Sequence, residues 1–72
     1  MKIFKENDSV SLTKAVNGEV IGKRRELTLP IGTVVTVVFV HGDPNHPKAY
    51  EIEAHVQEED CYVLATVEVD SF

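Results

Sequence analysis

Two histidines and an aspartate lie close together in the sequence and could, by residue type, hold a metal ion. His41, Asp43 and His46 fall within a segment rich in glycine and proline, with His55 or Cys61 as a distant fourth ligand. Zinc needs three or four ligands that converge in a tetrahedral arrangement. The spacing matches no recognised zinc motif, and Asp-Pro-Asn is ordinary turn chemistry. We therefore expect a solvated loop here, with no metal or cofactor.

Cys61 is the single cysteine of the chain and could act as a nucleophile with His55 as its base. Such a pair must reach hydrogen-bond distance, with the base held by a third group. If Val56 faces Cys61 across a hairpin, the side chain of His55 points to the opposite side. We therefore predict that Cys61 is a small core residue. A single cysteine also allows no internal disulfide.

Glu51 and Glu53 share one face of a predicted strand, and Glu68 could lie alongside on the next strand. Paired carboxylates perform acid–base chemistry only when burial or repulsion separates their pKa values. These residues alternate with core positions, so they are expected on a solvated face. The sequence thus predicts no catalytic residue and no enzyme. An acidic stripe that meets a basic protein is the functional alternative.

Lys23, Arg24 and Arg25 form the only basic cluster and could contact phosphate. The formal net charge is −5, from twelve carboxylates against seven Lys and Arg. Nucleic-acid binding depends on clustered positive charge, so this balance counts against a broad interface. Aromatic side chains for base stacking are also few, and most sit at core-compatible positions. A nucleic-acid-binding barrel that uses residues 23–25 is the alternative function.

The stretch from residue 30 to 41 is the element against which the other segments must pack. Turn-forming residues precede residues 33–40, all of which are β-branched or aromatic. The stretch is therefore predicted to be a strand. Both of its faces are apolar. Strict alternation places one set on one face (Val35, Val37 and Phe39) and another set on the other (Val34, Val38 and Val40). The strand is either central in a small barrel or turns one face to a partner.

Alternating apolar residues predict three further strands, over residues 9–12, 48–56 and 61–69. A polar four-residue connection, 57–60, joins the last two into a hairpin. The turn formers of residues 42–47 predict a loop.

Residues 13–29 break the alternation and are predicted to be a long early loop. Asn17-Gly18 favours a turn because both residues tolerate positive φ. A hairpin excursion, with Val20 and Ile21 tucked beneath it, is the economical interpretation.

The ends of the chain carry a few apolar side chains. Residues 1–8 are expected to form a loose arm anchored by Ile3 and Phe4, and Phe72 could close one end of a barrel.

These elements together predict an all-β fold in one domain over residues 1–72. Four to five short antiparallel strands with a long early loop are typical of a small SH3-like barrel or a strongly curled sheet. The start of the chain has no apolar run after its lysine, and eighteen apolar residues never run together. We therefore expect a soluble, cytoplasmic chain.

Four segments resemble a bacterial family of small SH3-like domains of unknown function. They are Asp8-Ser-Val-Ser-Leu-Thr-Lys, Ile31-Gly-Thr-Val-Val, Ala49-Tyr-Glu-Ile-Glu-Ala and Val63-Leu-Ala-Thr-Val. The resemblance covers roughly residues 7 to 70 and implies an SH3-like fold without catalytic residues. Some members are encoded beside another small protein in toxin–antitoxin-like pairs, which implies a partner protein. The basic triplet of residues 23–25, and Ala54 where the family tends to have a large aromatic, depart from the pattern.

The second apolar face of the predicted strand is the feature of the sequence that most strongly indicates a function. Val34, Val38, Val40, Tyr62 and Leu64 would form an exposed patch larger than monomers usually show, beside Glu51 and Glu53. The alternative is that the arm and the early loop cover this patch. We predict a non-catalytic protein-interaction module, as a homodimer or as the antitoxin-like or accessory half of a two-protein system. The surface of this chain that binds the partner is then apolar and acidic.

Overall fold

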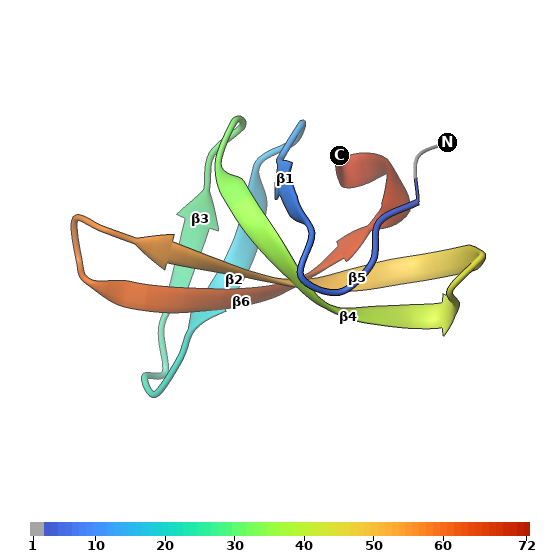
Figure 1. Ribbon diagram of the computed structural model, residues 1–72. Coiled ribbons are helices and arrows are strands. Elements are labelled where there is room, and N and C mark those ends of the chain that lie inside the picture. The colour runs from blue at the N-terminus through green and yellow to red at the C-terminus, as the bar shows by residue number, and fades with distance from the viewer. Residues whose placement is uncertain (1–2) are drawn as a thin grey trace.

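The computed structural model describes residues 3–72, which form one strongly curled antiparallel sheet (Figure 1). Its elements are β1 (Ser9–Ser11), β2 (Val16–Val20), β3 (Glu26–Leu29), β4 (Val34–Asp43), β5 (His46–Val56), β6 (Cys61–Glu68) and the short 3-10 helix η1 (Val69–Ser71). The strand order in the sheet is β1-β4-β5-β6-β2-β3. The all-β, curled antiparallel prediction is confirmed, but the sheet has six strands rather than four or five. No helix in residues 3–72 is long and apolar enough to cross a membrane.

The expected long early loop is in fact a hairpin of two strands, β2 and β3, added to the sheet beside β6. Asn17-Gly18 lies within β2, so the predicted turn at this pair is wrong, and the chain reverses over residues 21–25 instead. Gly18 serves close packing, because a Cβ there would lie 2.8 Å from the carbonyl oxygen of Leu64 on β6. Val20 is buried as expected, whereas Ile21 is half exposed.

The loop expected over residues 42–47 is also shorter than predicted. β4 continues to Asp43 and β5 begins at His46, which leaves a two-residue turn. The Asn45 amide donates a hydrogen bond of 2.8 Å to Oδ1 of Asp43, the local bonding that favours Asp in turns. The predicted connection between β5 and β6, residues 57–60, is confirmed.

An extra residue in β4 reverses the expected facing of two of its side chains. Val37 pairs with Ile52, but Phe39 pairs with Glu51, so β4 uses two residues where β5 uses one. Such a bulge shifts the alternation by one position. Phe39, expected beside Val37, is therefore half exposed, whereas Val40, expected on the second face, packs against the core.

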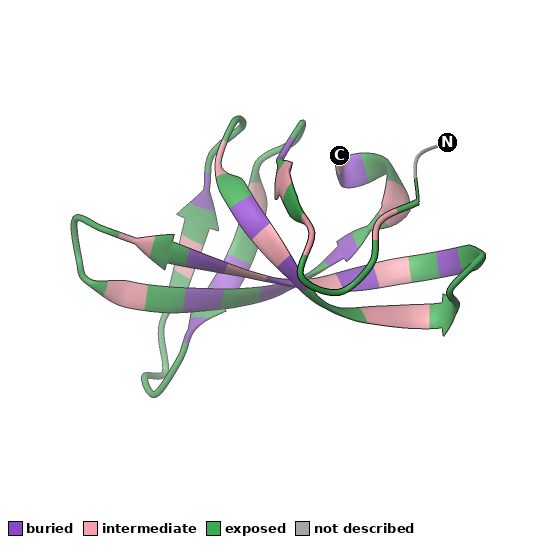
Figure 2. Cartoon of the chain, viewed as in Figure 1, coloured by how far each residue is buried: buried purple, intermediate pink, exposed green. Residues whose placement is uncertain are grey.

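The core fills the inner side of the curled sheet, as the alternation of buried and exposed positions along the strands shows (Figure 2). Its buried members are Leu12, Val20, Leu29, Val35, Val37, Tyr50, Ile52, Ala54, Val63, Ala65 and Val67. Burying each of the larger side chains contributes about 1.5–3 kcal/mol, so the inner face supplies most of the apolar stabilisation of the sheet.

Three aromatic rings close one end of this core. Phe4, Tyr50 and Phe72 lie edge to face, with ring centroids 5.0 to 6.0 Å apart. The Phe4 amide also donates a hydrogen bond of 3.1 Å to the Tyr50 hydroxyl. In the described part of the expected arm, Phe4 is thus an anchor, whereas Ile3 is half exposed. The first two residues of that arm lie outside the described residues.

Candidate functional site

The outer face of the sheet carries the side chains that alternate with the core. Backbone pairing brings its members into rows across neighbouring strands. One row runs from Thr36 on β4 through Glu53 on β5 and Leu64 on β6 to Glu19 on β2. The next row joins Phe39, Glu51 and Thr66. We call this surface, made by β4, β5, β6 and β2, the outer face.

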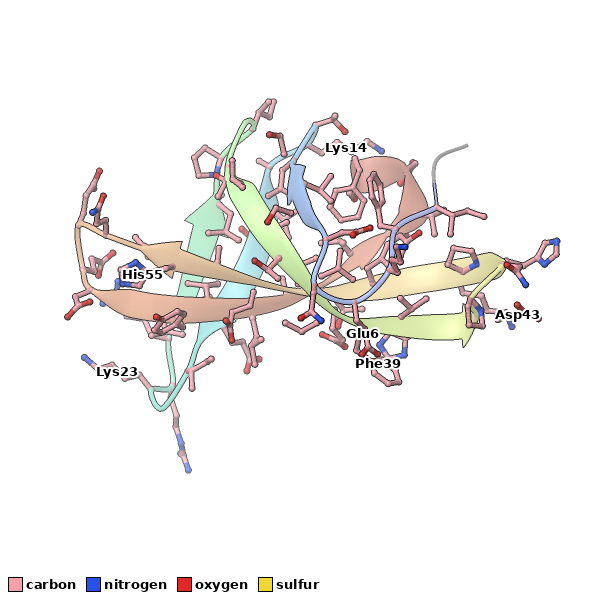
Figure 3. All side chains as sticks on the ribbon, viewed as in Figure 1. Glu6, Lys14, Lys23, Phe39, Asp43 and His55 are labelled. Carbon is pink, nitrogen blue, oxygen red and sulfur yellow. The ribbon has the colours of Figure 1, made fainter. Side chains whose placement is uncertain are left out.

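Large apolar side chains are exposed on the outer face. The exposed fractions are 63% for Val34, 39% for Val38, 49% for Phe39, 50% for Tyr62 and 39% for Leu64. Val38 is the extra residue of the bulge, so it and Phe39 follow each other on the same side. Phe39 projects from β4 away from β1 and the C-terminal turn (Figure 3).

Ile21 extends this apolar set at the end of β2. Its amide donates a hydrogen bond of 2.9 Å to the carbonyl of Tyr62, and 49% of the residue is exposed. The outer face therefore carries apolar groups from β4 across to β2.

Carboxylates are interleaved with these apolar groups. Leu64 lies between Glu53 on one neighbouring strand and Glu19 on the other, and Glu26 of β3 pairs with Glu19. Glu51 lies beside Phe39 in the next row. The outer face is thus both apolar and acidic.

Glu51 is held at the centre of a small polar network. Its Oε1 lies 3.0 Å from Nε2 of His41 and accepts a hydrogen bond of 2.7 Å from the Thr66 hydroxyl. The contact with His41, and secondly that with Thr66, holds the pKa of Glu51 below its ordinary value. The His41 ring also meets the Phe39 ring edge to face, with centroids 5.0 Å apart. Glu51 is therefore an ionised acceptor at neutral pH and a poor proton donor.

A second imidazole lies at the far end of the outer face. The rings of His55 and Tyr62 have centroids 4.8 Å apart, and Nε2 of His55 lies 3.1 Å from Oδ1 of Asp60 (Figure 3). The His55 ring thus lies against the exposed Tyr62 ring, and both ends of the outer face carry an aromatic side chain next to a histidine.

The segments expected to cover these side chains lie elsewhere in the described chain. The arm packs through Phe4 against Tyr50 and Phe72, at the end of the core. The β2–β3 hairpin extends the sheet and places Val20 and Leu29 in the core. Within residues 3–72, the apolar groups of the outer face therefore remain open to water.

Two of the residues considered for metal binding, His41 and Asp43, have other partners. His41 contacts Glu51, and Asp43 accepts from the Asn45 amide in the turn that leads to His46. Among residues 3–72, no group of three or more His, Cys, Asp or Glu is placed to hold a metal ion.

The cysteine–histidine pair is separated as the hairpin register predicted. Val56 pairs with Cys61 and His55 pairs with Tyr62, so adjacent positions place Cys61 and His55 on opposite faces. Cys61 is partly buried against the core.

The basic triplet lies at the tip of the β2–β3 hairpin. Lys23, Arg24 and Arg25 are exposed there, between Glu19 and Glu26. Arg25 forms an ion pair with Glu59. Its contact with Glu59 holds the pKa of Arg25 above its ordinary value.

Sequence reasoning missed three members of the outer face. Phe39 and Ile21 were expected inside, and Glu19 was expected in a loop. The alternation of Glu19 with Gly18 and Val20 is a weak strand signal that the Asn-Gly pair obscured. Comparison with family models, with curated proteins and with solved structures finds no match to this chain. The resemblance noted from the sequence therefore stays a prediction.

Proposed function

We propose that this chain is a non-catalytic protein-interaction module whose outer face binds another protein. The observation that carries the proposal is the set of large apolar side chains, from Val34 and Phe39 to Tyr62 and Leu64, on a face that residues 3–72 leave uncovered. Exposed apolar patches on small domains commonly mark interaction sites.

The composition of the outer face suits a protein partner. Phe39 and Tyr62 are rigid aromatic groups, the type that dominates the energy of protein interfaces. The carboxylates of Glu51, Glu53 and Glu19 lie among them and favour a partner surface with Lys or Arg. Apolar contact would supply affinity, and the charges would select the partner and its orientation.

The resemblance to small SH3-like domains extends this proposal. In the antitoxin-like or accessory version, the partner is a small protein encoded next to this one, and the module acts by covering the partner's active surface. In the homodimeric version, two outer faces meet.

The nucleic-acid alternative has weaker support. Arg25 is engaged by Glu59, and Glu19 and Glu26 flank the tip of the hairpin that carries the basic triplet. Neutralisation of phosphates requires positive charge that is not already paired within the protein.

Light scattering coupled to size exclusion tests the proposal, on the protein alone and mixed with the product of the neighbouring gene. We expect a dimer or a complex in at least one sample, and its loss in the double variant Phe39→Asp, Leu64→Asp. Ile31→Asp is the matched control, because Ile31 is 69% exposed but lies in the turn between β3 and β4. A monomer in every wild-type sample, or equal effects of the variant and the control, would contradict the proposal.

A further inference from the structure

A groove lies along the edge of β1 that does not pair with β4. Its volume is about 790 Å³, and Phe4, Val10, Phe72, Ser9 and Ser11 are among the residues that line it. In the described part of the chain β1 is an edge strand, with β4 on one side and the C-terminal turn on the other (Figure 1).

The register shows where the backbone groups of β1 point. The Leu12 amide donates to the carbonyl of Thr33 at 2.9 Å, and the Gly32 amide donates to the carbonyl of Leu12 at 2.8 Å. Leu12 thus bonds toward β4, and the direction alternates along an antiparallel strand. The amide and carbonyl of Ser9 and Ser11 consequently point toward the groove.

Thr13 shows that a backbone hydrogen bond can form at this edge. The Thr13 amide, which points the same way as those of Ser9 and Ser11, donates to the carbonyl of Ser71 at 2.8 Å. The C-terminal turn therefore occupies the last position of the edge and ends the groove there. Ser9 and Ser11 present their backbone amide and carbonyl groups to the groove in the same way.

We propose that this groove binds an extended segment of another protein as an added strand along β1. Backbone donors and acceptors at alternate positions match an extended chain, as in other proteins that bind peptides at a sheet edge. An apolar side chain of the segment would pack against Phe4, Val10 and Phe72. Among the residues that line the groove, only Asp70 has a charged side chain, and its carboxylate forms an ion pair with Lys14. The segment that fits is therefore extended and apolar.

A phage-displayed library of random heptapeptides, selected on the full chain, tests this site. The peptides that enrich are synthesised, and their affinities for the wild type and two variants are measured. Ser11→Pro removes an amide that points toward the groove and leaves the bonds between β1 and β4 in place. Ser11→Ala is the matched control, because it removes only the hydroxyl. We expect roughly tenfold weaker binding by Ser11→Pro and unchanged binding by Ser11→Ala.

Amide hydrogen exchange on the wild-type chain gives a second readout that needs no variant. We expect the bound peptide to slow exchange of the Ser9 and Ser11 amides. The proposal would be overturned if no peptide enriches. It would also be overturned if a bound peptide slows amide exchange only on the outer face around Phe39 and Leu64. A dimer of the wild type that Ser11→Pro dissociates would also overturn it, because a second copy would then be the occupant. Ser11 lies across from Val34 at the border of the outer face. Ser11→Ala changes that side chain as well, so a loss of binding confined to Ser11→Pro reports on the backbone amide, and the two proposals can fail separately.

Discussion

His41 and Glu51 face each other across β4 and β5, with Nε2 of His41 3.0 Å from Oε1 of Glu51. The same carboxylate oxygen accepts a hydrogen bond from the Thr66 hydroxyl, so three neighbouring strands are joined at one atom. The pKa of Glu51 is lowered from 4.5 by these contacts, the contact with His41 being the larger cause. The folded state therefore favours the ionised form of this group.

This coupling predicts a dependence of stability on pH. Because the pKa of Glu51 is lower in the folded state than in the unfolded state, its contribution is present above the unfolded value and is lost as pH falls. In Glu51→Gln, we expect the free energy of unfolding to change less between about pH 6 and about pH 3 than in the wild type. Urea titrations across this range measure the effect.

Glu53→Gln is the control for that experiment, since Glu53 lies on the same face of β5, two positions away. Its pH dependence should stay closer to that of the wild type. Equal flattening by both substitutions would show that the general charge of the outer face, rather than the contact with His41, is responsible.

Gly18→Ala should destabilise the protein by about 1–3 kcal/mol, the usual effect of overpacking a close contact. An alanine in a strand would ordinarily be favourable, but a Cβ here would meet the Val63 side chain and the carbonyl of Leu64. In a Val63→Ala background the loss should shrink, because the nearest obstructing atom is gone. Denaturant unfolding of the four proteins in this cycle measures both values. A penalty that Val63→Ala leaves unchanged would contradict the packing at Gly18.

Tyr50→Phe should cost about 0.5–1.5 kcal/mol, the net value of a typical hydrogen bond. Tyr50 is fully buried, and its hydroxyl accepts from the Phe4 amide. We also expect faster hydrogen exchange at the Phe4 amide. Tyr62→Phe removes a hydroxyl from an exposed ring and should change stability by less than about 0.5 kcal/mol. Similar losses in both variants would argue against the contribution of the Tyr50 bond.

The β5–β6 hairpin shows why much of the fold could be predicted from the sequence. Its alternation is unbroken, so Tyr50, Ile52 and Val63 are buried as expected and the polar turn falls at residues 57–60. When one face of a strand is buried and the other is exposed to water, the alternation of apolar and polar side chains determines its register.

The errors have a different origin, because they depend on contacts with distant segments. Gly18 resembles a turn residue in the local sequence, yet its place in β2 follows from close approach to β6. The bulge at Val38 arises from pairing with β5, and no residue type marks it in advance. For the outer face, alternation placed Val34, Val38, Tyr62 and Leu64 on the exposed side. It could not place Phe39 there.

Because of the bulge, a substitution of Phe39 tests which side chains of β4 point into the core. Phe→Ala in a core costs about 3–5 kcal/mol, and strict alternation would place Phe39 there. With 49% of Phe39 exposed, we expect Phe39→Ala to cost less than about 1 kcal/mol. Val37→Ala, two residues earlier and fully buried, should cost about 2 kcal/mol despite the smaller change in size. Thermal and urea unfolding rank the two variants, and a larger loss in Phe39→Ala would place the ring in the core and remove it from the outer face.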